Sequence, residues 1–126
     1  MLTTLTCLAM AIYMEARAEP ERGQIKVGLV VLNRAEEYKM EPCQVLKVPH
    51  QFSWYRNTNS LTIKPKDVAG WNTSLDAAKD ALVLHSFQIT YPKYFHNHTV
   101  RPRWAKYKVK VATIGNHTFY ADKKGG

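Results

Sequence analysis

The feature that most constrains the fold is an apolar helical run that ends in a carboxylate. Apolar residues recur at helical spacing as far as Ile12, and Glu15 follows three positions later on nearly the same face. Helical geometry therefore turns a carboxylic acid toward the core or a cleft wall. Burial disfavours the charged form and raises the pKa, as a general acid near neutral pH requires. A structural reading stays open, in which Glu15 pairs with Arg17 or Arg34, or is exposed where the helix frays.

A proline marks the boundary between the first two helices. The first helix is expected over residues 2–16. Pro20 disfavours helical geometry at Glu19 and suits the first position of a new helix, which is expected over residues 20–36. Two helices that meet at this point form a sharp corner, and the corner would hold Glu15 and Glu19 close to each other.

The rest of the chain changes from helical to extended patterns. Further helices are expected over residues 43–47 and 74–86, the second capped by Thr73, and strands over 94–97, 106–113 and 117–121. Gly115-Asn116 predicts a hairpin between the last two strands. Residues 49–72 lack periodicity, which is typical of a functional loop. We therefore predict one domain over residues 1–126 with an α+β fold, a mainly helical core and a small antiparallel sheet in the C-terminal third.

The chain of 126 residues is strongly basic, with a formal net charge of +8. This charge favours a polyanionic partner, such as nucleic acid, an anionic membrane surface or an anionic cell-wall polymer, although a solvated basic surface would look the same. No segment has the roughly 20 apolar residues needed to cross a bilayer, so no stable membrane insertion is expected. Residues 2–14 resemble the apolar part of a signal peptide but lack a basic start, so we interpret them as the first helix.

The cysteines and histidines give little support for a metal site. Cys7 and Cys43 are too few for a disulfide scaffold or a zinc ribbon, and they form either one disulfide or two free thiols. His96 and His98 share a face of a predicted strand, with His117 nearby, but no HExxH helix or adjacent carboxylate accompanies them. We therefore expect no metal and no organic cofactor.

Three later clusters mix aromatic rings with amide and imidazole groups. They are residues 51–55, residues 94–98 with 102–104, and residues 115–120. Carbohydrate sites use this mixture, because sugar faces stack on rings while hydroxyl and N-acetyl groups bond to Asn, Gln and His. Sites for single-stranded nucleic acid use it too. Many of these aromatic residues would serve equally well in a core.

The order of these motifs resembles the SleB/CwlJ-type cell-wall hydrolases, a family also found among bacteriophage lysis proteins. The matching strings are Glu15-Ala16-Arg17-Ala18-Glu19, Gly23-Gln24, residues 30–34, Cys43 with Val45-Leu46, residues 51–54, residues 94–97, Trp104 and residues 114–120. The resemblance covers nearly the whole chain. The family is similar to lytic transglycosylases and goose-type lysozymes in its helical core and single catalytic glutamate. Ala18 departs from the glycine that the family usually has there.

The resemblance implies cleavage of peptidoglycan between N-acetylmuramic acid and N-acetylglucosamine, by a lytic transglycosylase or a muramidase. Glu15 would be the general acid, with Glu19 and Arg17 in support. The expected substrate-binding residues are Gln51, Ser53, Trp54, Tyr94, Asn97, Asn116, His117 and Tyr120. The resemblance also favours a disulfide between Cys7 and Cys43.

The expected partner is the peptidoglycan glycan strand, bound by a monomer, and no nucleic acid partner is expected. A compact basic enzyme without a signal peptide suits a phage endolysin, made in the host cytoplasm and acting at the cell wall or periplasm after holin-type release. The alternative is a basic module for single-stranded nucleic acid in which Glu15 is structural. An amidase or peptidase would need a metal or a nucleophile that the sequence does not supply.

Overall fold

The computed structural model describes residues 3–48, 52, 54 and 67–123. The helices are α1 (Thr4–Ala16), α2 (Glu21–Tyr38), α3 (Pro42–Val45) and α4 (Val68–Ser86). The strands are β1 (Tyr94–Asn97), β2 (Val109–Ile114) and β3 (His117–Ala121), and a 3-10 helix, η1 (Arg103–Tyr107), precedes β2. The predicted α+β fold is therefore confirmed. Within the part of the chain described, no helix is long and apolar enough to span a membrane.

The first two helices begin and end close to where the sequence places them. The Thr3 side chain caps α1 by accepting a 3.1 Å hydrogen bond from the backbone N–H of Thr6. The α1 helix ends at Ala16, and Pro20 is the N-cap residue of α2, which begins one residue later than predicted and continues two residues further. The corner at Pro20 is thus present, and α1 and α2 meet there.

The prediction for α4 was wrong at its N-terminus. The helix begins at Val68, six residues before the predicted start, because Asp67 caps it by accepting a 2.8 Å hydrogen bond from the N–H of Gly70. Trp71 in the added turn packs edge-on against Tyr13 of α1, with ring centres 5.9 Å apart. Thr73, the predicted cap, lies inside the helix and bonds to the carbonyl of Ala69. Tertiary packing on α1 therefore extends this helix.

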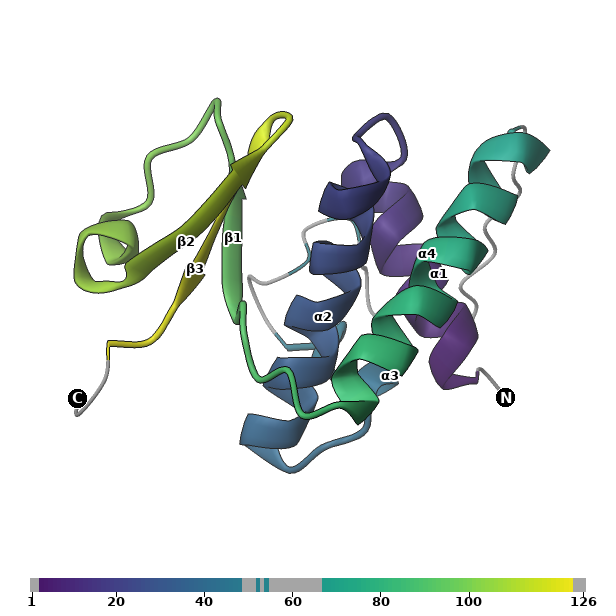
Figure 1. Ribbon diagram of the computed structural model, residues 1–126, viewed down its shortest axis with the longest axis horizontal. Coiled ribbons are helices and arrows are strands. Elements are labelled where there is room, and N and C mark those ends of the chain that lie inside the picture. The colour runs from purple at the N-terminus through teal and green to yellow at the C-terminus, as the bar shows by residue number, and fades with distance from the viewer. Residues whose placement is uncertain (1–2, 49–51, 53, 55–66, 124–126) are drawn as a thin grey trace.

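The α2 helix lies between the other long helices and the sheet (Figure 1). The core is built from small and branched residues of α1, α2 and α4, joined by Phe119 from the sheet. Gly28 of α2 allows close approach to α4, because a Cβ there would lie 2.8 Å from Cβ of Ala81. A disulfide between Cys7 and Cys43 joins α1 to α3, as the family resemblance implies.

The sheet is antiparallel, with the strand order β1-β3-β2. The predicted strands 94–97 and 117–121 are confirmed, but the predicted strand 106–113 was partly wrong. Lys106 and Tyr107 belong to η1, and β2 starts at Val109 with an irregular register between Lys110 and Ala112. The predicted hairpin at Gly115-Asn116 is present.

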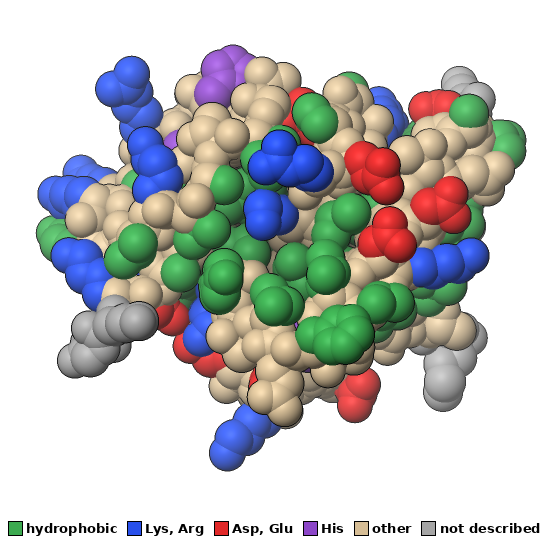
Figure 2. Space-filling model, in the orientation of Figure 1, with side chains coloured by type: hydrophobic (Ala, Val, Ile, Leu, Met, Phe, Trp, Pro, Cys, Tyr) green, Lys and Arg blue, Asp and Glu red, His purple; other side chains and the backbone are tan. Residues whose placement is uncertain are grey.

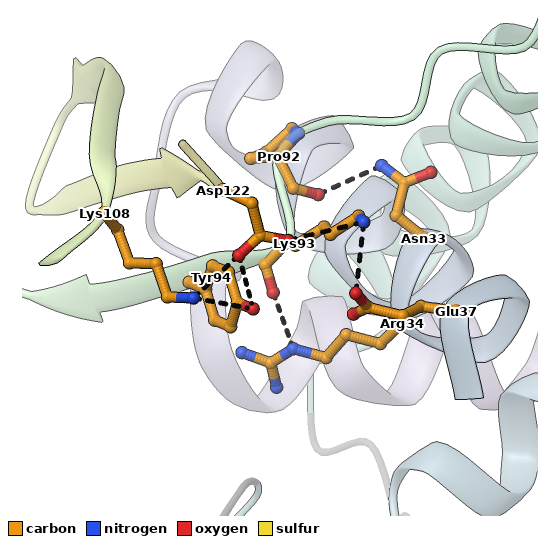
Figure 3. Close-up of polar contacts among 8 residues, drawn as sticks. All are labelled: Asn33, Arg34, Glu37, Pro92, Lys93, Tyr94, Lys108 and Asp122. Carbon is orange, nitrogen blue, oxygen red and sulfur yellow. Dashed lines mark hydrogen bonds and ion pairs between the residues drawn. The ribbon is translucent and has the colours of Figure 1, made fainter. Parts of the chain in front are cut away.

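A polar network fixes the sheet to α2 at the start of β1 (Figure 3). The side-chain amide of Asn33 donates a 3.0 Å hydrogen bond to the carbonyl of Pro92, and Nε of Arg34 donates a 2.6 Å bond to the carbonyl of Lys93. Nζ of Lys93 also bonds Glu37, at 3.3 Å. These contacts satisfy backbone carbonyls between α4 and the sheet and hold β1 beside α2.

Candidate active site

Glu15 lies in the last turn of α1 and is partly buried. The indole Nε1–H of Trp54 donates a 3.0 Å hydrogen bond to its Oε1. Desolvation by burial raises the pKa of Glu15 above its ordinary value. The Trp54 hydrogen bond and the positive charge of Arg34 act in the opposite direction but are smaller. Glu15 therefore keeps its proton to higher pH than a solvated glutamate, as a general acid requires.

Arg34 is the charge partner that acts on Glu15, and it is only 8% exposed. Its guanidinium lies over the ring of Tyr94, 5.6 Å from the ring centre, while its Nε bonds the carbonyl of Lys93. The sequence named Arg34 only as an alternative ion-pair partner and not as a site residue. The signal that could have found it is the polar pair Asn33-Arg34, which follows the apolar run Val30-Val31-Leu32 on a helix.

Among the described contacts, no hydrogen bond or ion pair joins Arg17 to Glu15 or Glu19, and its supporting role stays a prediction. The guanidinium of Arg17 lies over the ring of Tyr13, 4.9 Å from the ring centre. The carboxylates of Glu15 and Glu19 instead have Trp54 and the β2–β3 turn as their hydrogen-bond partners among the described residues. Arg17 is exposed at the end of α1, and a cation in water gains little from an ion pair.

Glu19 joins the corner between α1 and α2 to the turn between β2 and β3, and both features lie at the same end of the molecule (Figure 1). Its Oε1 accepts a 2.6 Å hydrogen bond from the backbone N–H of Asn116, and its Oε2 accepts a 3.2 Å bond from Nδ2 of the same residue. Nδ1 of His117 lies 3.5 Å from Oε1. Gln24 donates a bond to the backbone carbonyl of Glu19. Glu19 therefore holds the β2–β3 turn against the corner between α1 and α2.

His117 is 2% exposed, and its ring packs edge-on against Phe95. Burial lowers its pKa, while the charge of Glu19 raises it to a smaller extent. A side chain so deeply buried is better placed to support the Glu19 contact than to touch a sugar. The predicted role of His117 in substrate binding stays a prediction.

The predicted ligands Tyr94 and Tyr120 belong to an aromatic cluster on the sheet. The ring of Trp104 lies 5.6 Å from that of Tyr94 and 5.3 Å from that of Tyr120, and His96 stacks on Tyr120 at 5.4 Å. The Tyr94 hydroxyl donates to Asp122 at 3.0 Å and accepts from Lys108 at 3.2 Å (Figure 3). The hydroxyl of Tyr94 is therefore already engaged within the protein.

The remaining predicted ligands are Asn97, Gln51 and Ser53. Asn97 turns the chain after β1, because its Oδ1 accepts a 3.0 Å bond from the N–H of Thr99. Gln51 and Ser53 lie outside the described residues. The structure thus gathers Glu15 with Trp54, Glu19 with Asn116 and His117, and Tyr94 with Tyr120. In the described ranges, no group of three or more His, Cys, Asp or Glu residues is arranged to hold a metal ion.

A family model described as Cell Wall Hydrolase matches residues 18–120. This match confirms the family that the sequence motifs suggest. It covers Glu19, α2 and the three strands, and it begins three residues after Glu15. Neither the comparison with curated proteins nor the comparison with solved structures gives a match.

Proposed function

Because this chain belongs to the cell wall hydrolase family, and so is a peptidoglycan hydrolase, we propose that it cuts the glycan strand with Glu15 as its general acid. The bond cut would be the one between N-acetylmuramic acid and N-acetylglucosamine. The observation that carries this proposal is the environment of Glu15, a partly buried carboxyl group whose pKa is raised and whose Oε1 accepts a bond from Trp54. A carboxyl group whose pKa is raised by burial and which has a specific hydrogen-bond partner is a candidate for a functional site.

The Trp54 bond also favours one position for the acidic proton. An N–H donor prefers the carboxyl oxygen that does not carry the proton. Because Trp54 donates to Oε1, the proton belongs on Oε2. Oε2 then protonates the glycosidic oxygen as the bond from C1 to that oxygen breaks, which leaves an oxocarbenium-like centre at C1 of the muramoyl sugar.

The engagement of Glu19 supports a mechanism with one carboxylate. Most glycosidases use two carboxyl groups, the second as base or nucleophile. Both oxygens of Glu19 accept hydrogen bonds from Asn116, so this carboxylate is committed to holding the turn. The muramoyl 6-hydroxyl would then attack C1 itself, and the ionised Glu15 would take up its proton. The product of this route is a 1,6-anhydro end, whereas attack by water would give a reducing end.

The test is digestion of purified peptidoglycan by the wild type, Glu15→Gln and Glu21→Gln, with the products read by mass spectrometry. Glu21→Gln is the matched control, because it makes the same chemical change at an exposed position six residues further on. We expect Glu15→Gln to lose about a hundredfold to ten-thousandfold in rate, and Glu21→Gln to keep its rate. Wild-type products should be one water lighter than reducing muropeptides.

Each result separates the alternatives. Reducing ends whose formation depends on Glu15 would show that the enzyme is a muramidase and not a lytic transglycosylase. Release of free stem peptides would show an amidase or peptidase. Equal activity of Glu15→Gln and the wild type would overturn the role of Glu15. If the wild type and Glu15→Gln are both inactive on peptidoglycan and both bind single-stranded oligonucleotides tightly and in a salt-dependent way, the nucleic-acid-binding alternative would be favoured.

A further inference from the structure

Within the described ranges, the excess of positive charge is concentrated on the sheet and the segments beside it. Residues 93–123 contain seven Lys and Arg and a single acidic residue, Asp122. The described helical residues, 3–48 and 67–88, contain seven Lys and Arg against nine Asp and Glu. Figure 2 shows the same division, with basic side chains gathered over the sheet side of the molecule and acidic ones over the α4 side. The sheet therefore presents a basic surface, while the helices do not.

A groove of about 550 Å³ opens on this basic surface. Its cationic lining comes from four residues of the loop before η1, of η1 and of β2, which are Arg101, Arg103, Lys106 and Lys110. None of the described residues that line it is Asp or Glu. Thr118 and Tyr120 of β3 also line the groove, although Tyr120 is only 7% exposed, and they alternate with His117 and with Phe119 of the core. Because successive side chains of a strand point to opposite faces, the groove lies on the sheet face turned away from the helical core.

The four cations are not neutralised by the described part of the protein. Lys93 and Lys108, on the same sheet, each contact Asp122, at 3.5 and 2.7 Å. No described ion pair involves Arg101, Arg103, Lys106 or Lys110, and all four are exposed. Four like charges around one hollow repel one another, and a bound anion would remove that cost.

The groove also has apolar walls, which favour an anion that carries small apolar groups. Val100, Pro102 and Ala105 line it together with the cations, and Val100 is 50% exposed. The repeating backbone of a phosphodiester polymer presents sugar or glycerol carbons to these walls and no amino-acid methyl groups. The short stem peptides of peptidoglycan have both alanine methyl groups and free carboxylates. A volume of this size suits a ligand of a few residues.

We propose that this groove binds the carboxylates of a peptidoglycan stem peptide, with the arginines and lysines as donors and the small apolar side chains against alanine methyl groups. Charge-assisted bonds from arginine to carboxylate give geometric as well as electrostatic selectivity. This inference extends the proposed function, because the peptide is attached to the muramic acid of the strand that Glu15 would cut. The groove would thus select strands that carry peptides over bare glycan.

Binding is tested apart from catalysis. Every protein used in the binding test carries Glu15→Gln. Stem peptide released from a purified muropeptide is added to the protein, and binding is followed by NMR and by calorimetry. We expect saturable binding that weakens at least tenfold in Arg103→Gln/Lys110→Gln. The matched control, Lys47→Gln/Lys79→Gln, removes the same charge from exposed helical positions and should bind as before. Circular dichroism checks that each variant folds.

Catalysis is tested with two forms of one substrate, intact peptidoglycan and the same strands stripped of peptides by an amidase. In a background with intact Glu15, we expect Arg103→Gln/Lys110→Gln to raise KM about tenfold on intact strands, with kcat unchanged. On stripped strands the variant should match the wild type.

Three outcomes would overturn the proposal. The first is an equal loss on intact and stripped strands, which would assign the groove to the glycan. The second is that stem peptide does not bind, while poly(glycerol phosphate) or a single-stranded oligonucleotide binds in the groove. That result would assign the groove to phosphate. The third is unaltered peptide binding in Arg103→Gln/Lys110→Gln. Failure of Glu15 as the general acid leaves the peptide titration unaffected, so the two proposals fail separately.

Discussion

The backbone N–H of Asn116 donates a 2.6 Å hydrogen bond to Oε1 of Glu19, across 97 residues of sequence. Glu19 lies in the corner that follows Glu15, and Asn116 lies in the turn between β2 and β3. The side chain of Glu19 is 8% exposed, whereas Asn116, which donates the bond, is exposed. This contact fixes the position of the sheet relative to the end of α1, where the general acid is proposed to act.

Removal of the Glu19 carboxylate is expected to destabilise the protein. Glu19→Ala leaves the turn N–H without its acceptor and should cost about 2 kcal/mol, as for a hydrogen bond to a charged group. Asn116→Ala should cost less, because it removes only the side-chain donor and keeps the backbone N–H. Urea denaturation measures both, with the exposed Asp80→Ala as a control that should stay near wild type. An equal loss in Glu19→Ala and Asp80→Ala would contradict this account.

Gly115 is expected to tolerate no side chain while Glu19 is present. Its φ is +57°, and a Cβ would lie 2.7 Å from Oε1 of Glu19 and 3.0 Å from Cδ of Pro20. Gly115→Ala should therefore cost about 1–3 kcal/mol. In a Glu19→Ala background the closest clash is gone, so the same substitution should cost clearly less. A double-mutant cycle measured by denaturation gives the coupling. Simple additivity would show that backbone strain alone accounts for the loss.

The stability of the wild type relative to Glu15→Gln is expected to depend on pH. Folding raises the pKa of Glu15, so between the unfolded and folded values the native state binds more protons than the unfolded state. Wild-type stability from this group is present below the unfolded pKa and is lost as pH rises through the folded pKa. Glu15→Gln cannot ionise, so its Tm should gain on the wild type as pH rises from below the unfolded pKa of Glu15 through its raised folded pKa. A constant difference in Tm would show that the Glu15 pKa is not raised.

The Trp54 hydrogen bond is expected to set the upper pH limit of activity. The bond lowers the pKa of Glu15 against the larger effect of burial, so Trp54→Phe should raise this pKa further. A general acid works when protonated, and the high-pH limb of kcat/KM should therefore move to higher pH. Trp71→Phe is the control, because Trp71 packs on Tyr13 and donates no described bond to Glu15. A limb that moves to lower pH would contradict this assignment.

Local patterns account for much of the fold. The corner at Pro20 and the hairpin at Gly115-Asn116 depend on residues close in sequence, and both are found near their predicted places. The position of Glu15 at the end of an apolar helix could also be predicted, because helical spacing decides which face a residue occupies. The family followed from the order of short motifs.

The sequence by itself thus determined the elements whose signals are local, namely α1, α2, the short strands and the candidate acid at the end of the first helix. Tertiary structure contributed to the early start of α4, because Trp71 packs on Tyr13 there in addition to the local cap by Asp67. It also decided that Arg34 and not Arg17 acts on Glu15, and that Glu19 binds the β2–β3 turn. These contacts join residues far apart in the chain, and their energies depend on burial that only the assembled fold creates.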